Sequence, residues 1–163
     1  MSLQIRPTEP ADEAAIIAFL ARVFGTEASA PFLSPALMRW KYWLPREDFD
    51  GPRAYLSERD RRIVAHVGLW PITIHEARGT RRGVHMIDWG ADPAAPGAGV
   101  ALMQFAAREF DFVFSIGGTG DTQRILPRLG FQVVAEAVTF ARPLRPWRQA
   151  WRHQSRDWRL PAR

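Results

Sequence analysis

The stretch from Met86 to Glu109 constrains this chain more than any other, because it carries the pattern of a strand, a tight bend and a helix in immediate succession. An apolar run that contains one acid ends at Ala91, the bend Gly97-Ala98-Gly99 follows, and helical character begins near Val100. Glycines at the bend remove side chains where the chain enters the helix, so the first N–H groups of the helix are open to an anion. The positive end of the helix dipole favours the same anion. The sequence therefore predicts a phosphate-type site here.

Hydrophobic periodicity before this stretch predicts two helices and a set of antiparallel strands. Apolar residues at helical spacing indicate helices over 12–24 and 35–44. The period then changes to alternation, which is typical of strands. Strand-like segments cover 3–6, 54–58, 63–70, 72–74 and 84–91. A polar turn is expected over 78–83, and three consecutive antiparallel strands are expected before the bend.

A second set of elements is expected after the bend. The segment 112–116 is short and apolar, and the helix that precedes it suggests a crossover to a buried strand parallel to the strand that ends at Ala91. A short helix near Asp121 and closing strands over 133–134 and 138–141 complete the expected fold. The sequence thus predicts an α+β domain. Its mixed sheet has six to seven strands, is antiparallel except for a central parallel pair, and is flanked by helices.

Composition excludes several classes of function. The 163 residues include no Cys, which excludes disulfides, thiolate metal sites and a Cys nucleophile. None of the four His has a close HxH or HxxxH spacing, so no metal site is expected. No apolar run approaches the ~20 residues that cross a bilayer, and no signal peptide is recognised. We therefore expect a cytoplasmic protein without a transmembrane segment.

The net charge of +5 is located near the C-terminus. Residues 142–163 contain seven Arg and one Asp, whereas the rest of the chain contains 15 basic and 16 acidic residues. The body is nearly neutral, so the charge does not predict specific binding of nucleic acid by the folded domain.

The tail over 143–163, helical or partly disordered, has two interpretations. A helix would gather its arginines into a stripe, which suits weak contact with an anionic surface, with nucleic acid or with a partner protein. Alternatively, Trp147, Trp151 and Trp158 pack on the domain or on a second copy of the chain, as in a homodimer, while the arginines face solvent. The second interpretation is favoured because a terminal helix usually needs tertiary packing to be stable.

The element order, Asp92-Pro93, the Gly97-x-Gly99 bend and the later Leu129-Gly130-Phe131 together resemble the GNAT superfamily of acyl-CoA-dependent N-acyltransferases. The resemblance implies a GNAT-like domain over 1–142 that binds acetyl-CoA or another acyl-CoA as cosubstrate. In this family a Gln/Arg-x-x-Gly-x-Gly/Ala segment cradles the pyrophosphate. The matching window begins at Ala94, which replaces the usual Gln or Arg, and the implied binding residues in it and after it are Gly97, Ala98, Gly99, Val100 and Ala101.

The same resemblance implies where the reaction takes place. The strand end from Trp89 to Ala91 should diverge from its parallel neighbour and offer backbone groups of these two residues to the pantetheine arm. Asp88 stands where such enzymes often place the general base for the attacking amine. The implied reaction is N-acyl transfer, above all N-acetyl transfer, to a primary amine of a small molecule or peptide. Alternatively, Asp88 pairs with an Arg or caps a loop.

One further position limits this interpretation, and another offers an alternative base. Leu126 stands where many members have the Tyr that acts as general acid, and Tyr42 and Tyr55 lie too far away in the sequence to be assigned that role. A non-catalytic acyl-CoA-binding module and a truncated half of a larger acyltransferase are therefore alternatives. His66 could act as base if it enters the cleft, although a lone His on a strand is more often a hydrogen-bonded structural residue.

Overall fold

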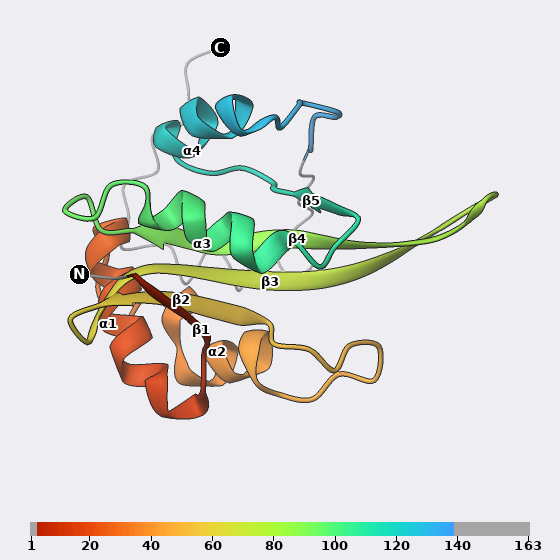
Figure 1. The fold of residues 1–163 in the computed structure, drawn as a ribbon. Coiled ribbons are helices and arrows are strands. Elements are labelled where there is room, and N and C mark those ends of the chain that lie inside the picture. The colour runs from red at the N-terminus through yellow and green to blue at the C-terminus, as the bar shows by residue number, and fades with distance from the viewer. Residues whose placement is uncertain (1–2, 139–163) are drawn as a thin grey trace, which may run out of the picture. The chain divides into compact units, whose positions relative to one another are not determined.

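The structure, a computed structural model, describes residues 3–138, and Figure 1 shows the order of its elements. The helices and strands are β1 (Gln4–Pro7), α1 (Glu13–Phe24), α2 (Pro35–Tyr42), β2 (Ala54–Arg59), β3 (Arg62–Glu76), β4 (Gly79–Ala91), α3 (Ala98–Ala107), β5 (Phe112–Phe114) and α4 (Gly120–Ile125). Three short 3-10 helices are η1 (Pro10–Asp12), η2 (Pro31–Leu33) and η3 (Leu126–Leu129). All of them belong to one compact unit, Met1–Phe131, and a second unit comprises Gln132–Arg163. The predicted tail over 143–163 lies outside the described residues.

The strands form one sheet in the order β1-β2-β3-β4-β5. Neighbours are antiparallel except for β4 and β5, which are parallel. The predicted α+β class, the three antiparallel strands before the bend and a parallel pair after it are thus confirmed. The pair was expected at the centre of the sheet, but β5 is the edge strand among the described residues. The described residues contain a five-stranded sheet, however, and the expected six to seven strands are not found in them.

Two local features account for the lower strand count. The segment 72–74 is no separate strand, because β3 continues through Pro71, which is paired with Val84 of β4. Proline is tolerated there because β2 pairs with β3 only as far as Gly68, so within residues 3–138 no strand pairs with β3 on that side of Pro71. Residues 133–134 form no strand, and the expected strand over 138–141 extends beyond the described residues.

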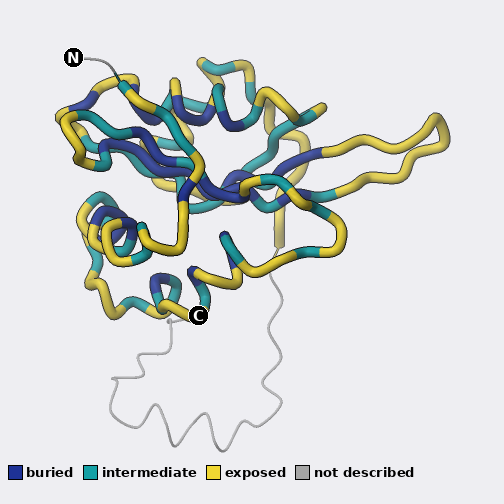
Figure 2. Tube along the Cα trace, turned by 60° about the horizontal axis from the view of Figure 1, so that its bottom comes forward, coloured by how far each residue is buried: buried dark blue, intermediate teal, exposed yellow. Residues whose placement is uncertain are grey.

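The hairpin of β3 and β4 extends past the other strands as an exposed arm (Figures 1 and 2). Glu76 pairs with Gly79, so the turn consists of Ala77 and Arg78. The predicted turn over 78–83 is therefore wrong beyond its first residue, because the polar residues after Gly79 continue β4. Their polarity reflects the exposure of the arm rather than a break in the strand.

Helices cover both faces of the sheet, and each face has its own core (Figure 1). On one face α3 packs over the strands, and on the other α1 and α2 do so. Ile16 and Leu20 lie one turn apart in α1 and are fully buried, as the helical periodicity predicts. The helix ends at Gly25, whose φ of 62° is the left-handed conformation that favours glycine. Within residues 3–138, no helix is long and apolar enough to span a bilayer.

Candidate functional site

Two glycines shape the connection from β4 to α3, each for a different reason. Gly97 precedes the helix with a φ of 82°, a conformation that residues with a side chain rarely adopt. A Cβ at Gly99 would lie 2.8 Å from the Cβ of Ala91, so the first turn of α3 packs directly against the end of β4. Trp89 strengthens the same contact by donating Nε1–H to the Gly99 carbonyl at 2.9 Å.

The first turn of α3 leaves backbone donors unused. The N–H of Ala98 donates to Ala95 and that of Ala101 to Gly97, so these two predicted binding residues have their N–H groups occupied. No acceptor among the described residues receives the N–H of Gly99 or Val100. These two groups lie at the positive end of the helix dipole, where an anion is stabilised.

Strands β4 and β5 diverge beside this turn. Their pairing is limited to Gly83–His85 of β4 and Phe112–Phe114 of β5. Further along β4, Gly90 and Ala91 pair with β3 on the other side. The edge of β4 at 89–91 that faces away from β3 therefore has no strand partner among the described residues, and its backbone groups are available to a ligand.

Asp88 lies at a bulge of β4 and points toward α2. The register of β3 with β4 shifts between His66 and Gly68, and Asp88 has a φ of 47°. This left-handed conformation costs about 1–2 kcal/mol in a residue other than glycine. The side chain is held in place, because its Oδ2 accepts hydrogen bonds from Lys41 Nζ and the Tyr42 hydroxyl, each at 2.5 Å. Its Oδ1 accepts none from the described residues.

Lys41 is the partner that compensates the charge of Asp88. It is the only Lys in the chain, and its side chain is only 9% exposed. Its Nζ also donates to the Phe32 carbonyl at 3.1 Å and lies 5.2 Å from the centroid of the Tyr42 ring. The ion pair expected as an alternative for Asp88 is thus present, with Lys rather than Arg as the partner.

His66 supports the bulge from β3. Its Nδ1 donates to the Asp88 carbonyl at 3.0 Å. Burial lowers the pKa of His66 to about 4, although the neighbouring Asp88 opposes this shift. Because His66 is fully buried, it is a neutral structural residue and does not reach into a cleft as a base. Its Nε2 has no hydrogen-bond partner among the described residues.

Tyr42 and Lys41 are the site residues that the sequence reasoning missed. The hydroxyl of Tyr42 contacts Asp88 although the two residues are 46 positions apart, so distance in the sequence was a poor reason to set it aside. Burial, followed by the charge of Asp88, raises the pKa of Tyr42 well above its ordinary value, so it is a hydrogen-bond donor. The signal available in the sequence was a single Lys within an aromatic, one-sided helix.

The position of the expected general acid is apolar in the structure as well. Leu126 begins η3 and packs, partly buried, against the core on the α3 face. No group of three or more His, Asp or Glu side chains in the described part of the chain is arranged to hold a metal ion. The polar groups brought together near the divergence are therefore those of Asp88, Lys41 and Tyr42, with the free N–H groups of α3 at the end of the same strand.

Comparison with known proteins identifies the fold. No family model matches the sequence, and no curated protein matches it. An acetyltransferase from Trypanosoma brucei superposes with a TM-score of 0.61 at 19% identity, over 86% of this chain and 99% of its own. A GCN5-related N-acetyltransferase from Ralstonia eutropha gives 0.59 at 21% identity, with the same coverage of 86% and 99%. A predicted acetyltransferase from Clostridium acetobutylicum, solved with acetyl-CoA, gives 0.62 at 14% identity over 86% and 96%. The chain therefore has the fold of the GNAT acetyltransferases.

Proposed function

We propose that this protein is an acyl-CoA-dependent N-acyltransferase that transfers an acyl group, above all acetyl, to a primary amine of a small molecule or peptide. The observation that carries the proposal is the end of the β4–β5 pairing at His85 and Phe114, which leaves one edge at the end of β4 without a strand partner among the described residues. The first turn of α3, with the free N–H groups of Gly99 and Val100, packs against this end of β4. The C. acetobutylicum structure of the same fold contains acetyl-CoA, which supports this ligand.

The first turn of α3 suits the phosphates of the cosubstrate, and the free edge of β4 suits its pantetheine arm. The phosphates bind at the first turn of α3, where backbone N–H groups and the helix dipole stabilise negative charge. The pantetheine arm extends along the free edge of β4 from Trp89 to Ala91 and forms hydrogen bonds with backbone groups there. This arrangement brings the thioester toward Asp88.

Asp88 acts as general base in the proposed reaction. Its Oδ2 is fixed by Lys41 and Tyr42, while Oδ1 is left to accept a proton from the attacking amine, directly or through a water molecule. The amine nitrogen bonds to the acyl carbon and the carbon–sulfur bond breaks, which gives an amide and the CoA thiolate. Leu126 has no proton to donate, so solvent protonates the thiolate, whose ordinary pKa is about 8.5.

A non-catalytic acyl-CoA-binding module is the second candidate, and one observation favours it. The Oδ2 atom of Asp88 already accepts hydrogen bonds from Lys41 and Tyr42 at 2.5 Å, as in a residue that has a structural role. This candidate shares the ligand with the first and differs only in turnover.

Two measurements test these candidates in order. Calorimetric titration with acetyl-CoA should give saturable binding, and absence of binding at high micromolar concentration would rule out both. Release of free CoA thiol with a panel of amines then tests catalysis. Asp88→Asn should abolish turnover while acetyl-CoA still binds. Asp121→Asn, on the exposed surface of α4, is the matched control and should leave turnover unchanged.

A further inference from the structure

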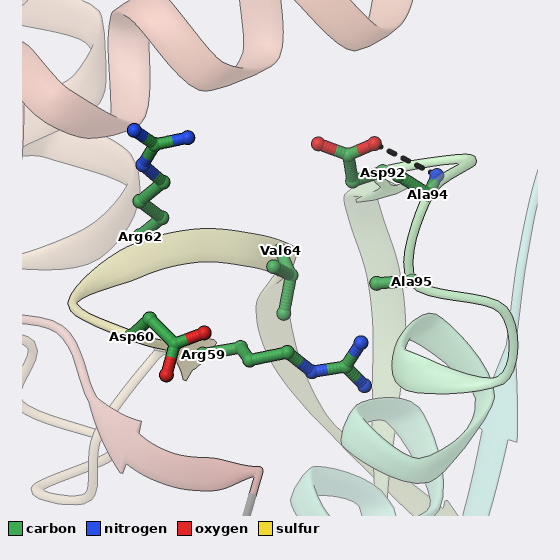
Figure 3. A pocket seen from close by; sticks show the side chains of 7 residues that line it. All are labelled: Arg59, Asp60, Arg62, Val64, Asp92, Ala94 and Ala95. Carbon is green, nitrogen blue, oxygen red and sulfur yellow. Dashed lines mark hydrogen bonds between the residues drawn. The ribbon is translucent and has the colours of Figure 1, made fainter. Parts of the chain in front are cut away.

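A pocket of about 380 Å³ lies between the turn of the β2–β3 hairpin and the loop from β4 to α3 (Figure 3). The hairpin contributes Arg59, Asp60 and Arg62 to its lining, and the loop contributes Asp92, Ala94 and Ala95. Figure 3 shows the Arg59 side chain extending toward Ala95, while Arg62 points to the other side of the hairpin. The pocket thus adjoins the loop that leads to the free N–H groups of α3.

The hairpin turn holds the two arginines in fixed positions. Asp60 and Arg61 form the turn with φ values of 53° and 62°, as a two-residue type I′ turn requires. Arg59 and Arg62 are therefore direct cross-strand partners. Because their side chains extend to different sides of the hairpin, only Arg59 is directed toward the loop from β4 to α3 (Figure 3).

The acidic groups near the pocket are already engaged, with one exception. Asp92 pairs with Arg22 at 2.8 Å and accepts the N–H of Ala94. Within residues 3–138, neither Arg59 nor Arg62 has an ion-pair partner, and the buried Nε of Arg59 has no hydrogen-bond acceptor. Asp60, exposed in the turn, is the exception. Two arginines and two aspartates line the pocket, so its formal charge is balanced. Asp92 is already paired with Arg22, however, and the buried Nε of Arg59 is a donor that lacks its acceptor among the described residues, which points to an anion.

We propose that Arg59 binds a phosphate group of acyl-CoA in this pocket and supplies the cation that the loop itself lacks at Ala94. The inference rests on the proposed function. Ala94 and Ala95 line the pocket and belong to the loop that leads to the N-terminus of α3, so the pocket adjoins the phosphate site proposed there. The planar guanidinium of Arg presents paired donors that match phosphate oxygens.

Calorimetric titration of three full-length proteins with acetyl-CoA tests this assignment. Arg59→Gln should weaken binding about 10- to 100-fold, as expected for loss of a charged hydrogen bond. Arg61→Gln removes the same charge from the same hairpin but does not line the pocket, so its affinity should stay near that of the parent protein. Equal weakening by both variants would overturn the role of Arg59, because it would indicate only a general effect of charge. Absence of binding by the parent protein would overturn the proposed function together with this inference.

A second variant and two ligands locate the contact. Ala94→Arg in the Arg59→Gln background should restore most of the affinity, because the new side chain places a cation on the neighbouring loop. Acetyl-pantetheine, which lacks the nucleotide phosphates, should bind the parent and Arg59→Gln equally, and a lower affinity for Arg59→Gln would overturn the assignment. The other ligand is 3′-dephospho-acetyl-CoA. If Arg59→Gln still binds this ligand more weakly than the parent does, Arg59 contacts the diphosphate. If the two proteins bind it equally, Arg59 contacts the 3′-phosphate.

Circular dichroism of Arg59→Gln and Arg59→Lys separates misfolding from loss of the contact. A native spectrum together with unchanged affinity for acetyl-CoA in Arg59→Gln would overturn the inference.

Discussion

His66 makes the stability of this protein depend on pH. Its pKa is about 4 in the folded protein, against an ordinary value of 6.5, and burial is the main cause. The unfolded chain therefore takes up the proton first as the pH falls. The contribution of neutral His66 to stability is complete above pH 6.5 and is lost between about pH 6.5 and 4, with a total loss of about 3 kcal/mol.

Urea unfolding of the parent protein and of His66→Asn at pH 7 and pH 5 measures this effect. Asn keeps a donor for the Asp88 carbonyl but does not titrate, so its free energy of unfolding should fall by about 2 kcal/mol less between these two pH values. Asp12 does not interfere, because hydrogen bonds from Arg6 lower its pKa, and its contribution is lost only as the pH falls below its ordinary value of 3.8. Equal losses in both proteins would contradict the assignment to His66.

The pair of Lys41 and Asp88 should be coupled in stability. Lys41→Met leaves a carboxylate at Asp88 whose side chain is only 16% exposed, with Tyr42 as its remaining donor among the described residues. The free energy of unfolding should therefore fall by about 2–4 kcal/mol. The double variant Lys41→Met/Asp88→Asn should recover part of this loss, since Asn carries no charge. Additive losses in urea unfolding would show that the two side chains do not interact energetically.

Residues that act through the local backbone could be predicted at this site, whereas tertiary partners could not. Gly97 and Gly99 were recognised because a bend before a helix demands glycine, and the structure adds the close approach of Gly99 to Ala91. Lys41 and Tyr42 were not assigned, because α2 contacts Asp88 only through the tertiary packing of the helix on the sheet. A single sequence does not contain that pairing in any local pattern.

Among the elements, the junction of β4 and α3 should be the most sensitive to a single added methyl group. Gly99→Ala places a Cβ 2.8 Å from the Cβ of Ala91, so α3 must shift, and the free energy of unfolding should fall by about 1–3 kcal/mol. The same shift should weaken binding of acetyl-CoA. Gly120→Ala at the start of α4 meets no atom within 4 Å and should leave urea unfolding nearly unchanged. Equal stability of the two variants would contradict the close packing at Gly99.

Helices were easier to predict than the ends of strands, because a helical period depends on the helix's own buried face, whereas the end of a strand depends on its neighbours in the sheet. The period of α1 follows from one buried face, and its bounds match the prediction closely. In β3, Pro71 suggested a strand end because proline lacks an N–H, but the missing neighbour on that side removes the need for one. In β4 the residues 79–82 are polar because they are exposed in the arm and pack on no core. Their polarity suggested a turn, although they belong to the strand. Both errors depend on which strand lies alongside, which local sequence does not specify.

At the scale of the whole molecule, removal of the basic residues 143–163 should not affect the binding of acetyl-CoA. Residues 143–163 carry six Arg and one Asp, so their removal changes the net charge from +5 to 0. The first turn of α3, Asp88 and Arg59 all belong to the unit Met1–Phe131. A chain that ends at residue 142 should therefore bind acetyl-CoA with unchanged affinity.

The same truncation tests the weak contact with anionic surfaces that the arginine stripe suggests. Sedimentation with vesicles that contain phosphatidylserine should be measurable for the full chain at low ionic strength and should fall as salt screens the charges. The truncated chain should remain in the supernatant, because a body with no net charge has no long-range attraction to the vesicle. If both chains sediment equally, the contact belongs to the folded unit, and the exposed β3–β4 arm with Arg78, Arg81 and Arg82 becomes the surface to test next. If neither sediments, the tail has no role at such surfaces, and packing of its tryptophans is the interpretation that remains.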